Sequence, residues 1–453
     1  MAGIFGTDGV RSRINTGAMR AEAIVRLALA AGRWFVDEKQ DHTQKPLVVI
    51  AKDTRLSGYM IEAALVAGFS SIGMDCKLLG PVPTSAVSIM TKRLKAHLGV
   101  MISASHNPYH DNGIKLFGPD GFKLDDEIET EISALMQGSI ALGSAEEMGR
   151  VRRILDSADD YVDYALNSVT DKALLSSMKI VVDCAHGAAY RTAPMTLEAL
   201  GADVIPLFND PDGLNINQDC GAVHPQKMAK AVLEQGADLG IALDGDADRL
   251  IVADATGHIY NGDNVLGAIA AAMHASGALK GPVVGTLMTN LGLERYFAEQ
   301  GMSFARAKVG DRYILERLKA DGGNIGGEGS GHILMPDMCP SGDGLMAALQ
   351  LISAAKTQDK TLQEALSLFE AVPQKLVNLE HMDKAILQDE RIEDQLAKQA
   401  SYLGDEGRVL LRPSGTEPVI RVMVEALDEG KMQASIDALC KTLQDVNQDY
   451  QSQ

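Results

Sequence analysis

The sequence predicts an α/β protein made of three related units, followed by a domain with a different pattern. Three segments, 46–80, 179–208 and 282–310, share one layout: a β-branched strand, a turn, an amphipathic helix and a second short strand. Strands that alternate with helices in this way are expected to pair in parallel, with both faces of the sheet covered. At 453 residues the chain is also too long for a single hydrophobic core.

The last part of the chain departs from this layout. Strand patterns over 371–380, 408–418 and 419–427, followed by a helix from about 429, indicate an α+β domain. The spacing of the three units also predicts the domain boundaries. We predict three α/β domains at 1–155, 156–255 and 256–369 and an α+β domain at 370–453, with one functional loop from each facing a common cleft.

The composition excludes several classes of partner. The net charge of -19 comes from 42 basic and 61 acidic residues, so the chain repels polyanions and nucleic acid is not expected as a partner. The five cysteines lack paired spacing, which favours a reducing, cytoplasmic location. We find no signal-peptide pattern and no apolar stretch long enough to span a bilayer, so no membrane is expected either.

Each unit leads to one polar loop at the end of its next strand. The loops are "SASHNP" (103–108), "DGDADR" (244–249) and "GGEGSGH" (326–332). Functional loops gather at the carboxyl ends of strands in α/β sheets, so these loops are candidate site segments. Taken alone, 103–108 is either a turn rich in turn-forming residues or a loop that presents a nucleophilic hydroxyl from Ser103 or Ser105.

The loop 244–249 carries three carboxylates at alternate positions, on Asp244, Asp246 and Asp248. Carboxylates clustered behind a buried strand repel one another and favour a hard divalent cation such as Mg²⁺. The alternatives are a solvated acidic turn and the start of a Ca²⁺ loop, although no Glu stands at position 12 of such a loop. Arg249 either neutralises a phosphate near that cation or forms a salt bridge with the adjacent aspartates.

Anion donors are concentrated in "RPSGTEP" (412–418) and on the strand that follows it. Two guanidinium groups, two hydroxyls and exposed backbone amides indicate a phosphate site, and the alternative is a Pro-Ser-Gly turn with surface arginines. The donors are Arg412, Ser414, Gly415, Thr416 and Arg421.

Other polar residues carry weaker signals. Glu328, Ser330 and His332 lie in a Gly-rich setting that suits hydrogen bonds to sugar hydroxyls, although a plain turn is the commoner meaning. Lys115 has two interpretations: it acts at a site as a cation or proton carrier, or it is simply an exposed lysine. The same two interpretations, a site residue or an exposed side chain, apply to Arg11.

Taken in this order, the four motifs closely resemble those of the α-D-phosphohexomutase superfamily, over essentially the whole chain. The resemblance implies a four-domain architecture around a central cleft, with three related mixed-sheet α/β domains and a C-terminal α+β domain. It implies that Ser105 is phosphorylated and that its phosphate, with the three aspartates, holds one Mg²⁺ per chain. It also implies catalytic roles for Lys115, Arg249, His332 and Arg11, and substrate contacts for Glu328, Ser330, Arg412, Ser414, Gly415, Thr416 and Arg421.

Three further stretches, 5–11, 213–221 and 309–318, resemble the branch of this superfamily that acts on glucosamine phosphates, whereas Ser12 and Gly329 depart from its usual Gly and Gln. The implied reaction interconverts glucosamine 6-phosphate and glucosamine 1-phosphate through a bisphosphosugar intermediate, on the route to UDP-N-acetylglucosamine. Relatives are often homodimers. The alternatives are a mutase for mannose or glucose phosphates, a Mg²⁺-dependent sugar phosphatase, and a non-catalytic sugar-phosphate sensor.

Overall fold

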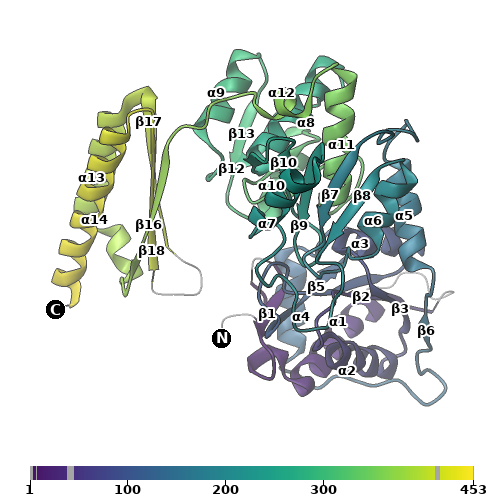
Figure 1. Ribbon diagram of the computed structural model, residues 1–453. Coiled ribbons are helices and arrows are strands. Elements are labelled where there is room, and N and C mark those ends of the chain that lie inside the picture. The colour runs from purple at the N-terminus through teal and green to yellow at the C-terminus, as the bar shows by residue number, and fades with distance from the viewer. Residues whose placement is uncertain (1–3, 7, 38–44, 414–418, 452–453) are drawn as a thin grey trace. The chain divides into compact units, whose positions relative to one another are not determined.

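The computed structural model describes residues 4–6, 8–37, 45–413 and 419–451 (Figure 1). The chain forms two compact units. The first comprises Met1–Thr286 and Ala305–Ser367, and the second comprises Leu287–Phe304 and Leu368–Gln453.

The first sheet of the first unit has six strands in the order β1-β5-β4-β2-β3-β6. β2 pairs in parallel with β3 and β4, whereas β5 is antiparallel to β4, so the sheet is mixed. Its buried aliphatic side chains form one core with those of α1 and α2. The elements are β1 (Val10–Arg13), η1 (Gly17–Met19), α1 (Ala21–Asp37), β2 (Leu47–Lys52), α2 (Gly58–Ser71), β3 (Asp75–Pro81), α3 (Thr84–Arg93), β4 (Leu98–Ile102), β5 (Asp111–Phe117), α4 (Asp126–Leu135) and β6 (Val151–Arg153).

The second sheet repeats the same plan with five strands in the order β11-β10-β9-β7-β8. β7 is parallel to β8 and β9, and β10 returns antiparallel to β9. All five residues of β9 are buried, as expected for a strand covered on both faces. The elements are α5 (Ser157–Asn167), β7 (Lys179–Asp183), α6 (Thr192–Ala199), β8 (Asp203–Leu207), α7 (Gln226–Gln235), β9 (Leu239–Leu243), β10 (Leu250–Asp254) and β11 (Ile259–Tyr260).

The third sheet has four strands in the order β13-β12-β14-β15, with β12 and β14 parallel and β15 antiparallel to β14. The predicted third segment is present as β12, α9 and β13, and α9 belongs to the second compact unit. The elements are α8 (Gly262–Ala275), β12 (Val283–Thr286), α9 (Leu291–Glu299), β13 (Phe304–Ala307), α10 (Asp311–Asp321), β14 (Gly326–Gly327), β15 (Ile333–Leu334), α11 (Gly344–Thr357) and α12 (Leu362–Leu366).

The second unit contains a three-stranded antiparallel sheet in the order β16-β18-β17. The predicted strands and the last helix are confirmed within the described residues, and the end of the second predicted strand, 414–418, lies outside them. In addition, α13 is a second long helix whose cap is the side chain of Asp389. The elements are β16 (Gln374–Glu380), η2 (Lys384–Gln388), α13 (Glu390–Leu403), η3 (Gly404–Glu406), β17 (Gly407–Pro413), β18 (Val419–Ala426) and α14 (Glu429–Gln451).

These sheets confirm the predicted fold class of three mixed-sheet α/β domains and one α+β domain. The individual domain boundaries and the common cleft stay predictions.

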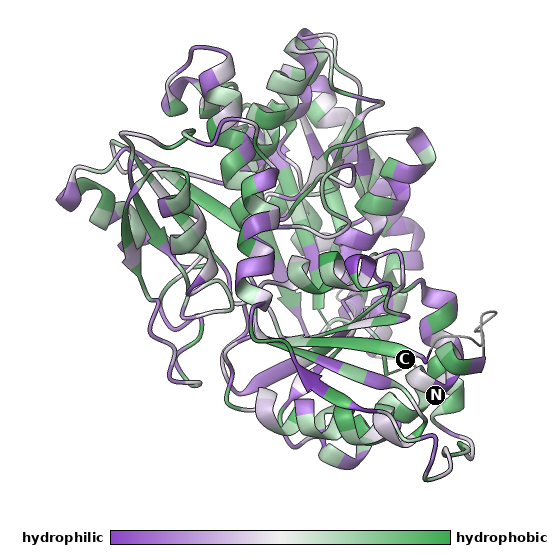
Figure 2. Ribbon diagram, turned by 90° about the vertical axis from the view of Figure 1, so that its right-hand side faces the viewer, coloured by the Kyte–Doolittle hydropathy of each residue, from purple (hydrophilic) through white to green (hydrophobic). Residues whose placement is uncertain are grey.

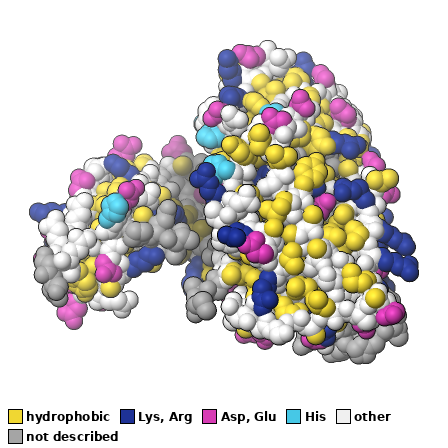
Figure 3. Space-filling model, turned by 90° about the horizontal axis from the view of Figure 1, so that it is seen from below, with side chains coloured by type: hydrophobic (Ala, Val, Ile, Leu, Met, Phe, Trp, Pro, Cys, Tyr) yellow, Lys and Arg dark blue, Asp and Glu magenta, His cyan; other side chains and the backbone are white. Residues whose placement is uncertain are grey.

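Figure 2 shows hydrophobic stretches on the strands and mixed colours along the helices, the pattern of helices that cover sheets. On the face drawn in Figure 3, basic side chains lie singly or in small groups among acidic and uncharged ones. Within the described residues, no helix has both the length and the apolar character to cross a bilayer.

Candidate active site

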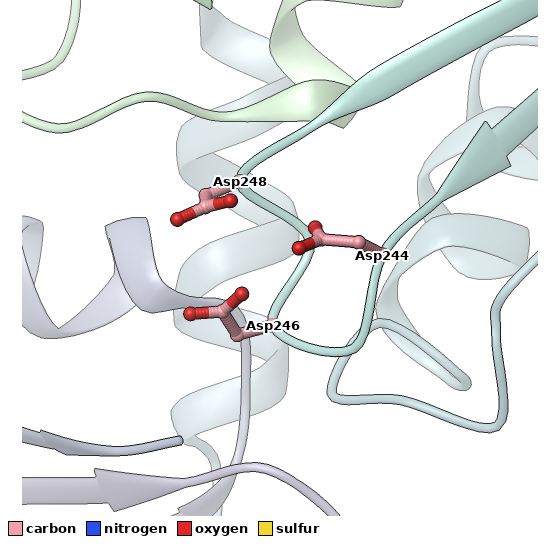
Figure 4. A group of neighbouring side chains, drawn as sticks. All are labelled: Asp244, Asp246 and Asp248. Atoms are coloured by element: carbon pink, nitrogen blue, oxygen red, sulfur yellow. The ribbon is translucent and has the colours of Figure 1, made fainter. Parts of the chain in front are cut away.

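Asp244, Asp246 and Asp248 lie in the turn between β9 and β10, and their carboxylates face a common point (Figure 4). All three are buried, and one oxygen from each lies within 4.8 Å of the others. The turn is tight because Ala247 adopts a positive φ of 59°. Gly245 is required for a different reason: a Cβ there would lie 2.5 Å from the carbonyl oxygen of Ser105. Because the three aspartates are buried, the alternative of a solvated acidic turn is wrong.

The electrostatics of this cluster call for a cation. Burial, followed by repulsion from Asp248 and Asp246, raises the pKa of Asp244 to about 8. Among the described residues, Asp246 Oδ1 has no hydrogen-bond partner although it is buried. Buried carboxylate oxygens that converge and lack donors are a fitting ligand set for a hard divalent ion.

Ser105 brings a hydroxyl to this cluster from the first sheet. It follows β4, is buried, and adopts a left-handed backbone with φ 51°. Its Oγ donates a 2.6 Å hydrogen bond to Asp244 Oδ2. Its backbone N–H donates to Ser103 Oγ at 2.9 Å, and that hydroxyl donates to Asp53 Oδ2 at 2.7 Å. Hydrogen bonds thus fix the segment 103–108 around Ser105, and it is not an ordinary surface turn.

Lys115 lies on β5 and is buried, so the interpretation as an exposed lysine is wrong. Its Nζ lies 2.9 Å from Asp246 Oδ2, 3.1 Å from Asp248 Oδ2 and 3.3 Å from Asp8 Oδ2. Burial opposes the charged form, but the three carboxylates outweigh it and raise the pKa of Lys115 well above its usual value. Lys115 is therefore an ammonium cation beside the aspartate loop.

Arg249 forms two long ion pairs with the adjacent aspartates, as the salt-bridge interpretation predicts. Its Nε lies 4.0 Å from Asp244 Oδ2 and 3.9 Å from Asp248 Oδ1, and its backbone N–H donates to Asp244 Oδ1 at 3.1 Å. Its side chain stays 23% exposed. The guanidinium is held beside the carboxylates and can still reach a further anion.

The third loop places His332 next to the aspartate cluster. Its Nδ1 lies 3.5 Å from Asp248 Oδ1, and its Nε2 lies 3.7 Å from Asp311 Oδ2. Although burial disfavours the imidazolium, Asp248 and then Asp311 raise the pKa of His332 to about 9. In the same loop, Glu328 accepts hydrogen bonds from Gly310 N at 2.9 Å and from Ser330 Oγ at 3.0 Å.

Three residues that the sequence analysis did not single out complete this site. Asp8 pairs with Arg11 at 2.7 Å, and Lys123 pairs with both Asp8 and Asp311. Oppositely charged groups therefore alternate around a closed ring, which consists of Asp248, Lys115, Asp8, Lys123, Asp311 and His332. Asp8 and Asp311 lie within the stretches 5–11 and 309–318, whose resemblance to the family is the sequence signal that marks them.

Two other strand ends also contribute residues that were missed. Thr84, just beyond β3, donates from its Oγ1 to Asp246 Oδ2 at 2.6 Å. Asp53 and Arg55 follow β2 and bind the 103–108 loop. The rule that polar residues at the carboxyl ends of strands form sites would have found all three, had it been applied to β2 and β3.

In the second unit, Arg412 and Arg421 are direct partners across β17 and β18. Side chains at opposed positions share one face of a sheet, so two guanidinium groups lie together there. The predicted donors Ser414, Gly415 and Thr416 lie outside the described residues.

Comparison with known proteins agrees with this arrangement along the whole chain. Four family models match, all described as phosphoglucomutase/phosphomannomutase: α/β/α domain I over residues 2–141, domain II over 159–257, domain III over 261–372 and the C-terminal domain over 376–441. The crystal structure of a phosphoglucomutase/phosphomannomutase family protein from Burkholderia thailandensis superposes with a TM-score of 0.82 at 23% identity, covering 98% of this chain and 97% of that one.

Two further relatives are more similar to this chain in sequence than that structure is. A phosphoglucosamine mutase from Paramagnetospirillum magneticum is 49% identical over 97% of this chain and 98% of its own length. Another, from Maricaulis maris, is 50% identical over 93% of this chain and 94% of its own length. The fold and the site thus define the class, that of the four-domain phosphohexomutases. Within this class, the chain belongs to the phosphoglucosamine mutase family.

Proposed function

We propose that this protein is an isomerase that interconverts glucosamine 6-phosphate and glucosamine 1-phosphate through a phosphoserine enzyme and a bisphosphosugar intermediate. Two relatives that carry the name phosphoglucosamine mutase support the substrate, since each is about half identical to this chain over nearly its full length. The observation that carries the chemistry is the 2.6 Å hydrogen bond from Ser105 Oγ to Asp244 within the aspartate cluster.

The three aspartates and a phosphate on Ser105 would hold one Mg²⁺ per chain. The fit rests on their converging buried oxygens and on the position of Ser105 Oγ beside Asp244. When bound, the ion offsets negative charge on the phosphoryl oxygens during transfer.

The chain's own cations act on the same group. Lys115 and Arg249 lie beside the aspartates, and Arg11 is tied to the ring through Asp8. In the first transfer a sugar hydroxyl oxygen forms the new bond to phosphorus, while the bond between phosphorus and Ser105 Oγ breaks and its electron pair stays on Oγ. Fixed cations around this phosphoryl group stabilise its charge without reorganising.

The hydroxyl proton needs an acceptor, and we assign His332 to this role. Its pKa is high because Asp248 and Asp311 face it, so any offset of the Asp248 charge moves that pKa back toward the ordinary imidazole range. Lys115 stays protonated between its three carboxylates and acts as a cation.

Substrate contacts divide between two groups of residues. Glu328 and Ser330 offer a carboxylate and a hydroxyl to the sugar, while the residues around β17 and β18 offer donors to its phosphate, namely Arg412, Ser414, Gly415, Thr416 and Arg421. The bisphosphosugar must then turn so that its other phosphate faces Ser105 and restores the phosphoserine.

A side-by-side assay tests this function. We expect the purified protein with Mg²⁺ and a trace of bisphosphosugar to convert glucosamine 6-phosphate at least tenfold faster, in kcat/KM, than mannose or glucose 6-phosphate. A preference for mannose or glucose phosphate would contradict the proposed substrate. Release of inorganic phosphate without the isomeric sugar phosphate would indicate a phosphatase instead.

The expected homodimer and cytoplasmic location also stay proposals. The five cysteines form no disulfide in the structure, and four of them are buried. Sedimentation of the purified chain would measure its oligomeric state.

A further inference from the structure

We propose that Arg55 and Asn217 are positioning residues for phosphoryl transfer, because together they fix the backbone that carries Ser105. This inference rests on the proposed function, since it assigns the geometry of the nucleophile in that reaction. The side chains of Arg55 and Asn217 act on backbone carbonyl groups of the 103–108 loop.

Arg55 uses every N–H of its guanidinium group within this part of the fold. Nε donates to Asp53 Oδ2 at 2.8 Å. The two terminal nitrogens donate to four backbone carbonyls, on Ser105 at 3.0 Å, Asn107 at 2.8 Å, Pro108 at 2.5 Å and Asp111 at 3.2 Å. The side chains of Arg55 and Asp53 are both 0% exposed. A lysine cannot reproduce this planar fork of donors.

Asn217 holds the same loop from the second sheet's domain. Its Nδ2 donates to Ser105 O at 2.9 Å and to Asn107 O at 3.1 Å. The carbonyl of Ser105 therefore receives one donor from each of two domains. The segment around Asn217 is itself fastened to the first domain, because Leu56 N donates to Gly213 O at 2.9 Å.

These contacts determine where the Ser105 hydroxyl points. Ser105 has a φ of 51°, a left-handed conformation that a serine keeps only when its surroundings hold it. Its carbonyl is held by Arg55 and Asn217, and its N–H by Ser103 Oγ. With both ends of the residue fixed, its Oγ is directed at Asp244, which is the direction that transfer requires.

Asp53 links Arg55 to Ser103. Its Oδ2 accepts from Arg55 Nε and from Ser103 Oγ, and its Oδ1 accepts from Arg55 N at 2.9 Å. The guanidinium and the hydroxyl that bind Ser105 are thus oriented by one buried carboxylate. Loss of the guanidinium fork releases four carbonyls at once, so the loop gains alternative conformations while the sheet beneath it remains.

The test compares Arg55→Lys with wild type and with Arg26→Lys. Arg26 is a matched control because it also donates to two loop carbonyls in the same domain, those of Met136 and Gly138, which belong to no part of the site. For Arg55→Lys we expect kcat to fall about 100-fold while KM stays within about threefold, because the nucleophile is displaced by a fraction of an ångström to an ångström. Arg26→Lys should keep the wild-type kcat.

Two readouts separate positioning from general destabilisation. Amide hydrogen exchange should become faster in residues 103–111 of Arg55→Lys and stay unchanged in the other sheets. Phosphorylation of Ser105 by glucose 1,6-bisphosphate, followed by intact mass, should slow by a similar factor to kcat. A loss of activity that only tracks the folded fraction, with uniform changes in exchange, would overturn the inference.

Asn217→Ala provides a second variant if Arg55→Lys folds poorly. It removes one of the two donors to Ser105 O, so we expect a smaller fall in kcat, about tenfold, again with little change in KM. A wild type that is inactive on glucosamine phosphates would refute the proposed function, whereas an active wild type matched by both variants would refute the positioning role alone.

Discussion

Ser105 Oγ and Asp244 Oδ2 lie 2.6 Å apart although 139 positions separate the two residues in the chain. One follows β4 in the first sheet and the other follows β9 in the second, so the contact joins equivalent strand ends of two repeated units. A hydroxyl at this point would lie within reach of a cation bound by the three carboxylates.

Metal binding should stabilise the fold. The three aspartates converge only in the folded chain, so a cation binds the folded state, and we expect Mg²⁺ at 100 times its dissociation constant to add about 2.7 kcal/mol to the free energy of unfolding. Thermal unfolding with EDTA and with Mg²⁺ measures this effect. Asp246→Asn should lose most of the response, whereas the control Asp254→Asn, at the opposite end of β10, should keep it. An unchanged melting temperature of wild type on adding Mg²⁺ would contradict the metal assignment.

Metal binding should also release a proton. The pKa of Asp244 is raised to about 8 in the metal-free protein, mainly by burial, so at neutral pH this carboxyl holds a proton that a cation must displace. The affinity for Mg²⁺ should therefore rise with pH by up to about tenfold per unit below 8 and level off above it. Titration calorimetry in two buffers of different ionisation enthalpy counts the released protons. Asp244→Asn should release none, and equal release by both proteins would refute this origin.

Lys123 should be important for stability because it bridges Asp8 and Asp311 with its side chain only 10% exposed. Lys123→Met removes the closest cation from Asp311, while Asp8 keeps Lys115 and Arg11 as partners, and we expect a loss of about 1.5–3 kcal/mol in the free energy of unfolding. The double variant Lys123→Met/Asp311→Asn should recover part of that loss. Denaturant unfolding gives these values. The exposed pair of Lys280 and Asp337 serves as a control, since Lys280→Met should cost at most about 1 kcal/mol.

Arg421 should bind the substrate phosphate from the sheet of the second unit. Arg421→Met should lower kcat/KM for glucosamine 6-phosphate about 10- to 100-fold, because a charge-assisted hydrogen bond is lost. Stability should not fall, since Arg412 and Arg421 are direct partners on one face and like charges at opposed positions are unfavourable. Steady-state kinetics and melting temperatures measure both effects. Lys431→Met, which removes an exposed ion pair with Glu406, should leave kcat/KM unchanged; an equal loss in both variants would argue against a phosphate contact.

The sequence allowed much of the fold to be predicted because its signals are local. The β-branched runs that become β2, β7 and β12 are each followed by a helix, as the local residue pattern predicts. The expected amphipathic character is clear in α9, whereas α2 is largely apolar and buried and α6 is only weakly amphipathic. The antiparallel return strands β5, β10 and β15 were not foreseen from the units themselves. These strands are short or almost fully buried partners of the preceding strand, and their direction depends on the turn and on the sheet edge that they join.

The site was predictable where chemistry is concentrated in one segment and not where it is assembled from several. The three aspartates lie within five residues, so the sequence alone indicates a carboxylate cluster, and Ser105 follows a predicted buried strand. Lys115 looked like a surface residue, because its carboxylate partners Asp246 and Asp248 lie 131 and 133 positions away. Arg55 carries no distinguishing local pattern, since its role is defined by carbonyls 50 to 56 positions further along.

The most direct test of the account is the intact mass and the mutase activity of wild type and Ser105→Ala, measured on the same preparations. We expect wild type to carry one phosphate adduct after exposure to a bisphosphosugar and to convert glucosamine 6-phosphate. Ser105→Ala should carry no adduct and lose activity by a factor of about 10³ or more, because the covalent route is removed. Full mutase activity in Ser105→Ala would contradict the phosphoserine mechanism.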